Sequence, residues 1–185
     1  MLVLQPDRPG MRKLNNEELV RKTQQEFKEA LKTPLILVMD NVRSLNNVGS
    51  VFRTADSFLL EAVYLCGITG TPPHKDIQKT ALGATDTVQW SYFETTLEAV
   101  AALKKDQFKV YAVEQAEHSM MLNEFKINPG QKVAFILGNE INGVDQQVIL
   151  DCDGVIEIPQ TGFKHSLNIA IAAGIVSWEV YRQLM

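Results

Sequence analysis

The sequence lacks the features that mark membrane, secreted and metal-binding proteins. Its longest apolar run, from Ile169 to Val176, is less than half of the roughly 18 residues that a membrane-spanning helix needs. The N-terminus has no charged start followed by an apolar core, which argues against a secretory signal. The two cysteines, Cys66 and Cys152, and the three histidines stand without disulfide or metal-ligand spacing. These absences favour a cytoplasmic protein without a metal site or membrane anchor.

An excess of basic charge is lacking as well. The chain carries 18 Lys and Arg against 22 Asp and Glu, which gives a formal net charge of -4. Proteins that bind nucleic acid mainly through its phosphates are commonly basic. A nucleic-acid partner would therefore have to bind to a local basic patch. The 185 residues are enough for one domain with a substantial core.

Several common catalytic and nucleotide-binding motifs are missing. There is no G-x-G-x-x-G after a strand and no G-x-x-x-x-G-K-[ST], which removes support for the usual dinucleotide and triphosphate folds. There is no G-x-S-x-G, and the adjacent pair His165 and Ser166 does not make a hydrolase triad. Other residues must therefore carry any chemistry that the chain performs.

Six apolar, strand-like runs alternate with helical patterns along the chain. The runs are 35–40, 62–67, 87–93, 109–114, 132–138 and 154–159. The helical patterns are 47–59, 75–81, 95–105, 145–151 and about 166–184. This alternation predicts an α/β fold with a mostly parallel six-stranded sheet flanked by helices. We expect one domain, 34–185, after an N-terminal helical arm, 1–33, whose helix begins near Asn15.

Polar residues that follow strands are candidate site residues, because ligands of parallel sheets bind beyond the carboxyl ends of the strands. After the first run, Asn47 and Arg53 lie less than two helical turns apart and can reach the same rim. After the fifth run, Gly138 allows a ligand to approach the backbone and Glu140 supplies a carboxylate. After the last run, Ser166 begins the final helix beside free backbone N–H groups.

Each of these places also has a purely structural interpretation. Asn47 can cap a helix while Arg53 is solvated. The residues around Gly138 can form a glycine-rich turn with a helix-capping acid. Ser166 can be a simple N-cap. The residues taken singly do not decide between the two interpretations.

Taken together and in this order along the chain, however, the three stretches are specific for one protein family. "NNVGSVFRTAD", "FILGNEINGV" and "IPQTGFKHSLNIAIAAGI" strongly resemble the three signature motifs of the SpoU (TrmH-like) RNA 2'-O-ribose methyltransferases of the SPOUT superfamily. "KTALGATDTVQW" is similar to the central segment of that family. The resemblance covers about residues 34–184. It implies a SPOUT fold with a C-terminal trefoil knot that holds S-adenosylmethionine.

The resemblance also implies roles for particular residues. The residues implied to contact the cofactor are Val113, Gly138, Ile158, Ser166 and Leu167. The residues implied to form the active site are Asn47, Arg53, Glu140, Ser166 and Asn168. A guanidinium rarely gives up its proton, so we expect Arg53 to clamp a phosphate, oriented by Asn47 and Glu140. Gln160 departs from many relatives, which have Met at this place in the cofactor loop.

The implied partners are an RNA substrate and a second copy of the chain. tRNA is favoured over rRNA, and the alternative function is a non-catalytic RNA-binding module of the same fold. For the homodimer, the apolar residues of the last helix offer a surface, with ordinary core packing as the alternative: Ile169, Ala172, Ala173 and Val176. An N-terminal group of basic residues forms either a basic patch or a solvated helix face: Arg8, Arg12, Lys13, Arg21 and Lys22. A second group, in loops near the predicted cleft, is the better candidate for phosphate contacts: Arg43, Lys75, Lys79 and Lys164.

Overall fold

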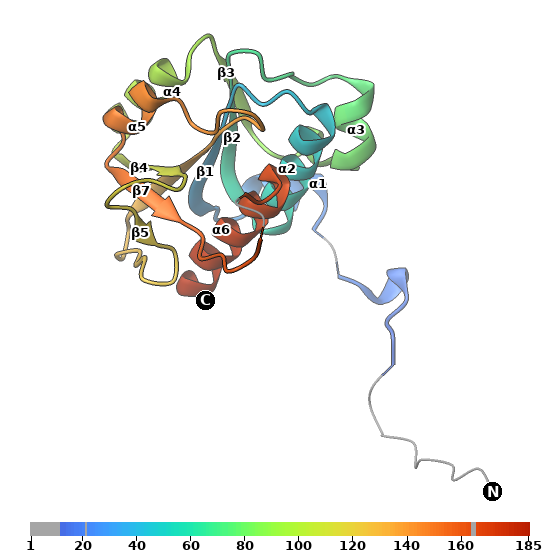
Figure 1. Cartoon of the computed structure of the whole chain (residues 1–185). Coiled ribbons are helices and arrows are strands. Elements are labelled where there is room, and N and C mark those ends of the chain that lie inside the picture. The colour runs from blue at the N-terminus through green and yellow to red at the C-terminus, as the bar shows by residue number, and fades with distance from the viewer. Residues whose placement is uncertain (1–11, 21, 164–165) are drawn as a thin grey trace, which may run out of the picture.

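The fold is built on one parallel sheet at the centre of the domain (Figure 1). The computed structural model describes residues 12–20, 22–163 and 166–185. The sheet has seven strands in the order β3-β2-β1-β6-β4-β7-β5. Their bounds are β1 Thr33–Asp40, β2 Leu60–Cys66, β3 Trp90–Phe93, β4 Phe108–Val113, β5 Met120–Met121, β6 Lys132–Leu137 and β7 Gly154–Glu157.

The predicted α/β class and parallel sheet are confirmed, but the predicted count of six strands is wrong. The additional strand is β5, whose two residues pair with β7 in the register Met120 to Ile156 and Met121 to Glu157. A strand of two residues is too short to show either an apolar run or an alternating pattern, so the sequence gives no signal for it.

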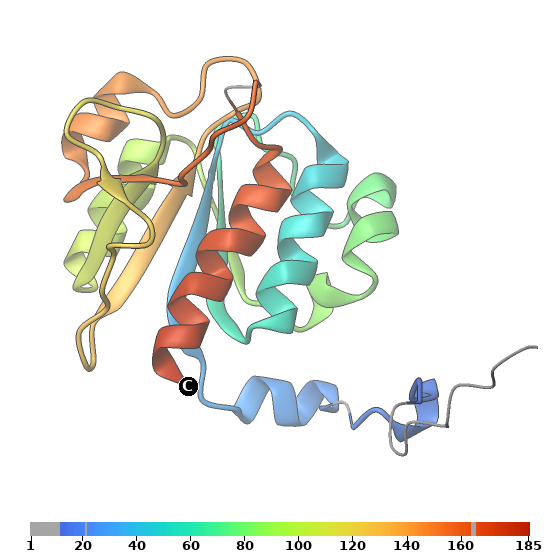
Figure 2. The same cartoon turned by 60° about the horizontal axis from the view of Figure 1, so that its bottom comes forward.

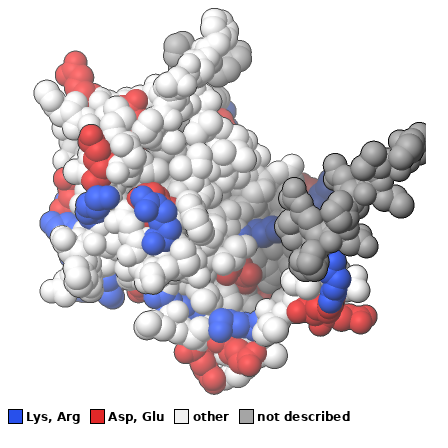
Figure 3. Space-filling view, turned by 90° about the horizontal axis from the view of Figure 1, so that it is seen from below, with Lys and Arg blue, Asp and Glu red and all other residues white. Residues whose placement is uncertain are grey.

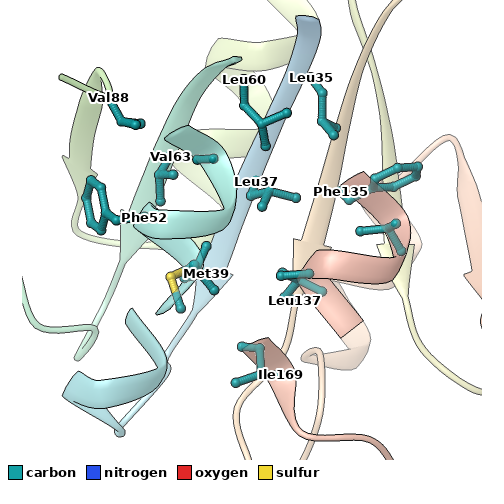
Figure 4. Close-up of a cluster of buried hydrophobic side chains, with 14 of the residues drawn as sticks. Leu35, Leu37, Met39, Phe52, Leu60, Val63, Val88, Phe135, Leu137 and Ile169 are labelled. Carbon is teal, nitrogen blue, oxygen red and sulfur yellow. The ribbon is translucent and has the colours of Figure 1, made fainter. Parts of the chain in front are cut away.

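The central strands are apolar throughout because both faces of the sheet are covered. In β1, Leu35, Leu37 and Met39 point into one core cluster, while Ile36 and Val38 point into the other. Figure 4 shows the first cluster, where Phe52 of α2 and Ile169 of α6 meet the sheet. The alternation of side chains along β1 thus supplies both cores at once.

Two layers of helices cover the sheet (Figure 2). The long helices α2 and α6 lie side by side on one face, with α3 outside them, and α4 and α5 cover the other face. Their bounds are α1 Gln24–Glu29, α2 Leu45–Ser57, α3 Lys75–Ala81, α4 Thr96–Lys105, α5 Gln146–Asp151 and α6 Ile169–Leu184, with 3-10 turns η1 Asn16–Glu18 and η2 Ala84–Asp86. None of the described helices is long and apolar enough to cross a membrane.

The structure corrects where two of the predicted helices begin. The last helix begins at Ile169 and not at Ser166, because the side chain of Asn168 caps it by accepting from the Ala170 N–H. Ser166 therefore lies in the loop before the helix. The helix after β1 begins at Leu45, two residues earlier than predicted, because Ser44 is its N-cap.

The predicted N-terminal helix is wrong in its extent. Asn15 precedes only the 3-10 turn η1, and α1 begins later, at a capping box of Thr23 and Glu26. The buried side chain of Phe27 anchors α1 to the core. The described part of the arm otherwise lies outside the sheet and its helices (Figure 1).

We expect Phe52→Ala to be the costlier of two matched truncations. The Phe52 side chain is fully buried between α2 and the sheet, so its removal leaves a cavity that should lower the free energy of unfolding by about 3–5 kcal/mol. Leu150→Ala, at a side chain that is 68% exposed, should change it by about 0.5 kcal/mol or less. Urea denaturation of both variants measures the difference, and equal losses would contradict this account of the core.

Candidate active site

A pocket of about 1150 Å³ lies at the carboxyl ends of β4, β6 and β7. Its walls come from the turns that follow these strands and from the start of α6. All five residues that the sequence predicted as cofactor contacts line it: Val113, Gly138, Ile158, Ser166 and Leu167. Gln160, Glu140 and Asn168 line it too. The structure thus gathers in one cavity Val113 and residues from the second and third motifs, although their contact with a cofactor stays a prediction.

The floor of the pocket is a turn in which the backbone crosses itself closely. A Cβ on Gly138 would lie 2.0 Å from the carbonyl carbon of Gly143, so no side chain fits there. Gly143 has a φ of +67°, which favours glycine. The Asn139 side chain completes the turn by accepting from the N–H groups of Ile141 and Asn142. Glycine at these two positions allows the chain to reverse its direction, and the pocket opens beside this turn.

A network of hydrogen bonds joins the three motifs at the pocket. One oxygen of Glu140 accepts from Asn47 Nδ2 at 3.1 Å and from the Ser44 N–H at 3.3 Å. The other oxygen accepts from the Arg43 N–H at 3.3 Å. Asn47 Oδ1 in turn accepts from Asn168 Nδ2 at 3.2 Å. Asn47, Glu140 and Asn168 are therefore brought together as predicted.

These contacts keep Glu140 ionised. Desolvation acts to raise the pKa of the Glu140 carboxyl, but hydrogen bonds from backbone N–H groups and from Asn47 together lower the pKa below its ordinary value of 4.5. A carboxylate that already accepts from several donors is a weak general base. Its evident effect is to fix the side chain of Asn47, which then orients Asn168.

Arg53 does not join this network, contrary to the prediction that Asn47 and Glu140 orient it. Six residues along a helix amount to 600° of rotation at about 100° per residue, which places Arg53 and Asn47 about 120° apart around α2. The exposed Arg53 side chain instead lines a second pocket of about 550 Å³ between α2, α3 and α6, together with Lys79 and Ile171. The short distance between Asn47 and Arg53 in the sequence did not predict their positions, because it takes no account of this rotation.

Glu114 is a pocket residue that the sequence-based prediction missed. It was counted as the last residue of a strand, but β4 ends at Val113 and Glu114 belongs to the pocket wall. One carboxylate oxygen accepts from the Val144 N–H at 3.1 Å. A polar residue directly after an apolar run was the signal that could have identified it. Among the described residues, no three His, Cys, Asp or Glu side chains gather as metal ligands.

The predicted phosphate contacts are only partly within the described residues. Arg43, Lys75 and Lys79 are exposed on the domain. Arg12 is engaged with the Glu18 carboxylate, so its charge is locally balanced. Lys13 and Lys22 are exposed. Arg8, Arg21 and Lys164 lie outside the described residues.

Comparisons with known proteins identify the family to which the chain is similar. The SpoU rRNA Methylase family matches residues 34–178. An uncharacterized tRNA/rRNA methyltransferase of Borreliella burgdorferi is 29% identical over 178 residues, which are 93% of this chain and 77% of that protein. The 23S rRNA (guanosine-2'-O-)-methyltransferase RlmB of Xylella fastidiosa is 29% identical over 150 residues, 80% of this chain and 59% of that protein.

A solved structure shows the same fold. The AdoMet-bound rRNA methyltransferase of Sinorhizobium meliloti superposes with a TM-score of 0.76 and 26% identity, over 82% of this chain and 57% of that one. The chain thus spans less than two thirds of the length of two of these three relatives.

We expect the charge of Glu140 to stabilise the fold only at a pH where the carboxylate persists. Its pKa is lower in the folded state, so Glu140→Gln should be less stable than the wild type above about pH 4.5, by about 1 kcal/mol or less for this exposed group. The difference should shrink as the pH falls further, when the wild-type carboxylate takes up its proton. Denaturant unfolding at pH 7 and pH 3.5 measures it.

The matched control is Glu124→Gln, at an exposed carboxyl for which the described residues supply no hydrogen-bond donor. At pH 7 it should unfold at the same denaturant concentration as the wild type, because the substitution removes no hydrogen bond to the described residues. A deficit of Glu140→Gln that stays the same at both pH values would show that the charge of Glu140 plays no part.

Proposed function

Because the chain belongs to the SpoU rRNA Methylase family, we propose that it transfers a methyl group from S-adenosylmethionine to a ribose 2'-hydroxyl of RNA. The observation that carries the proposal is the network of Asn47, Glu140 and Asn168 at the rim of a pocket lined by all five predicted cofactor contacts. Similarity to an AdoMet-bound rRNA methyltransferase and to a guanosine-2'-O-methyltransferase supports the cofactor and the target atom.

The pocket fits S-adenosylmethionine in size and in charge. Its volume of about 1150 Å³ is slightly larger than the roughly 300–1,000 Å³ of common ligand pockets, so a cofactor of this size can enter. Val113, Ile158 and Leu167 supply apolar surface for an adenine ring. The described lining includes the carboxylates of Glu114, Glu117 and Glu140 and neither Lys nor Arg, which suits a cofactor with a net positive charge. When bound there, the cofactor supplies an electrophilic methyl group.

The residues of the chain would then position the ribose and manage its proton. Methyl transfer requires the 2'-oxygen to lie about 3 Å from the methyl carbon and in line with the bond that breaks. Asn168, held by Asn47, and the nearby Ser166 are placed to orient the ribose. The guanidinium of Arg53 would stabilise the developing alkoxide, while a phosphate oxygen of the RNA receives the proton of the hydroxyl.

A homodimer would explain why Arg53 lies apart from the network of its own chain. Ile171 is 56% exposed, Trp178 is 49% exposed, and the Trp178 ring lies 6.1 Å from that of Phe58. Ile171 lines the same pocket as Arg53, so a second copy covering this face would bring other residues to Arg53. An exposed apolar face of this kind is typical of a protein interface.

The residues predicted to form the dimer surface are not the ones that the structure exposes. Ile169, Ala173 and Val176 are buried in the core, and Ala172 packs against the core and lines the large pocket. The exposed apolar residues of α6 lie on the opposite face and include Ile171 and Trp178. Periodicity alone could not separate the two faces, because α6 is apolar on both.

The course of the chain before α6 supports the proposed trefoil knot. Strand β7 lies beyond β4, whereas α6 packs against α2, β1 and β6. The described residues Ile158, Gln160 and Ser166 of the connection between β7 and α6 line the same pocket as the turn 138–144, which follows β6. We propose that this connection threads the turn, so that the cofactor pocket is the inside of the knot.

The choice of RNA rests on local positive charge. The face seen in Figure 3 carries Lys and Arg interspersed with Asp and Glu, without a broad basic surface. Arg53 and Lys79 share a pocket and offer two cations to a phosphate backbone. We propose tRNA over rRNA as the substrate. The alternative, a non-catalytic RNA-binding module, is favoured only by the net charge of -4, and the intact network argues against it.

We expect Arg53→Ala to abolish methyl transfer while leaving cofactor affinity nearly unchanged, because Arg53 lies outside the large pocket. Nucleoside mass spectrometry of separated tRNA and rRNA, from cells with and without the gene, should show the loss of one 2'-O-methylnucleoside. The wild type and the control Lys105→Ala, at an exposed residue ending α4, should restore it, and Arg53→Ala should not.

Calorimetry with S-adenosylmethionine gives the second half of this test. An unchanged nucleoside profile together with no cofactor binding would favour the RNA-binding module. Equal loss of transfer and of cofactor affinity in Arg53→Ala would contradict the role given to Arg53.

We expect Trp178→Glu to convert the dimer to a monomer, because it places a charge in the centre of the proposed apolar interface. Sedimentation velocity at micromolar concentration measures the change. Leu150→Glu, at a more exposed apolar residue of α5 on the other face of the sheet, is the control and should remain dimeric. A monomeric wild type would show that this face has no such partner.

A further inference from the structure

Two carboxylates outside the predicted active site hold the turn that forms the floor of the large pocket. This turn follows β6, and β6 lies between β1 and β4 in the sheet. Asp40 is the last residue of β1, and Glu114 directly follows β4. The two side chains therefore reach the turn from opposite sides, and they accept hydrogen bonds from consecutive backbone N–H groups, those of Val144 and Asp145.

On one side, Glu114 fits closely against the turn. One of its oxygens accepts from the Val144 N–H at 3.1 Å, and the other accepts from the N–H of Gln115 at 2.9 Å. A Cβ on Gly143 would lie 2.0 Å from the oxygen that binds Val144. The glycine thus leaves room for the carboxylate. Glu114 is half-buried and has no cationic partner among the described residues, so backbone N–H groups are its partners.

On the other side, Asp40 is buried and more fully bound. One of its oxygens accepts from the Asp145 N–H at 3.2 Å. The other accepts from the hydroxyl of Thr96 and from the amide of Asn41. Asp40 is thus fixed by the start of α4 as well as by its own strand. Asp40 is therefore the more firmly held of the two carboxylates, and Glu114 is the one that lines the pocket.

We propose that Glu114 is a positioning residue for the cofactor: its carboxylate holds the turn 138–144 at the distance from β4 that S-adenosylmethionine requires. The inference rests on the function proposed above. Glu114 acts through Val144 and Gly143, and these two residues line the pocket together with Gly138. A hydrogen bond to an ionised acceptor is stronger than one between neutral groups, which suits a carboxylate for this task.

Two variants of Glu114 and one control separate positioning from simple charge. Glu114→Ala removes the acceptor and leaves the Val144 N–H unpaired, whereas Glu114→Gln keeps an oxygen that can accept from it. Glu117→Gln removes a negative charge from the same pocket, at a side chain that accepts no hydrogen bond from the described residues. Calorimetry with S-adenosylmethionine and hydrogen exchange of individual amides are measured on all three full-length variants.

Positioning predicts a specific pattern. Glu114→Ala should raise the Kd for S-adenosylmethionine about tenfold or more and speed the exchange of the Val144 amide. The Asp145 amide, held by Asp40, should exchange as in the wild type and serves as the control within the molecule. Glu114→Gln should recover most of the affinity. Glu117→Gln, which removes a charge from the same pocket but no hydrogen bond, should weaken binding no more than Glu114→Gln does and far less than Glu114→Ala.

Three outcomes would overturn the inference. One is wild-type affinity in Glu114→Ala. Another is weakening by both Glu114→Gln and Glu117→Gln as large as that by Glu114→Ala, which would assign the effect to charge. The third is unchanged exchange of the Val144 amide. If the wild type itself binds no S-adenosylmethionine, the proposed function fails, while the exchange of the Val144 amide still decides whether Glu114 holds the turn.

Discussion

The arrangement of the site depends on one carboxylate, that of Glu140, which joins segments that the sequence keeps far apart. Its hydrogen bond to Asn47 spans 93 positions, and the next bond in the network, from Asn168 to Asn47, spans 121. The carboxylate also accepts from two backbone N–H groups just before α2, which have no partner within the helix. Glu140 therefore stabilises the start of α2 and sets the direction of Asn47 with the same two oxygens.

The molecule separates its charges by location. The pocket at the ends of β4, β6 and β7 has carboxylates in its wall, whereas Arg53 and Lys79 lie on the outer side of α2 and α3. A cationic small molecule and a polyanion would thus approach the rim from different sides, and neither would have to displace the other. This separation is compatible with a net charge of -4, because only the local field near each ligand matters at physiological salt.

The sequence was sufficient where a feature depends on local pattern. The alternation of apolar runs and helices predicted the parallel sheet, and the three motifs identified the family and the residues around the pocket. The sequence was insufficient to predict features that depend on contacts between residues far apart in the chain. The last helix is capped by Asn168 and not by Ser166, and the Asn168 side chain is also held by Asn47 from a distant part of the chain. Arg53 was misplaced because its direction depends on helix rotation. Glu114 could have been noticed at the end of its apolar run, but its contact with Val144 could not be predicted, because the two residues are thirty positions apart.

The aromatic cluster of Phe58, Trp178 and Tyr181 gives the protein an optical property. The chain has two tryptophans, Trp178 on the open face of α6 and Trp90 on the edge strand β3. The indole of Trp178 is half in water, with the Phe58 and Tyr181 rings 6.1 Å and 6.3 Å away. A macromolecule that covers this face excludes that water and moves the fluorescence of Trp178 to shorter wavelengths. Trp90 contributes a separate fluorescence background. Binding at α6 can therefore be followed by the fluorescence of Trp178 without any added label.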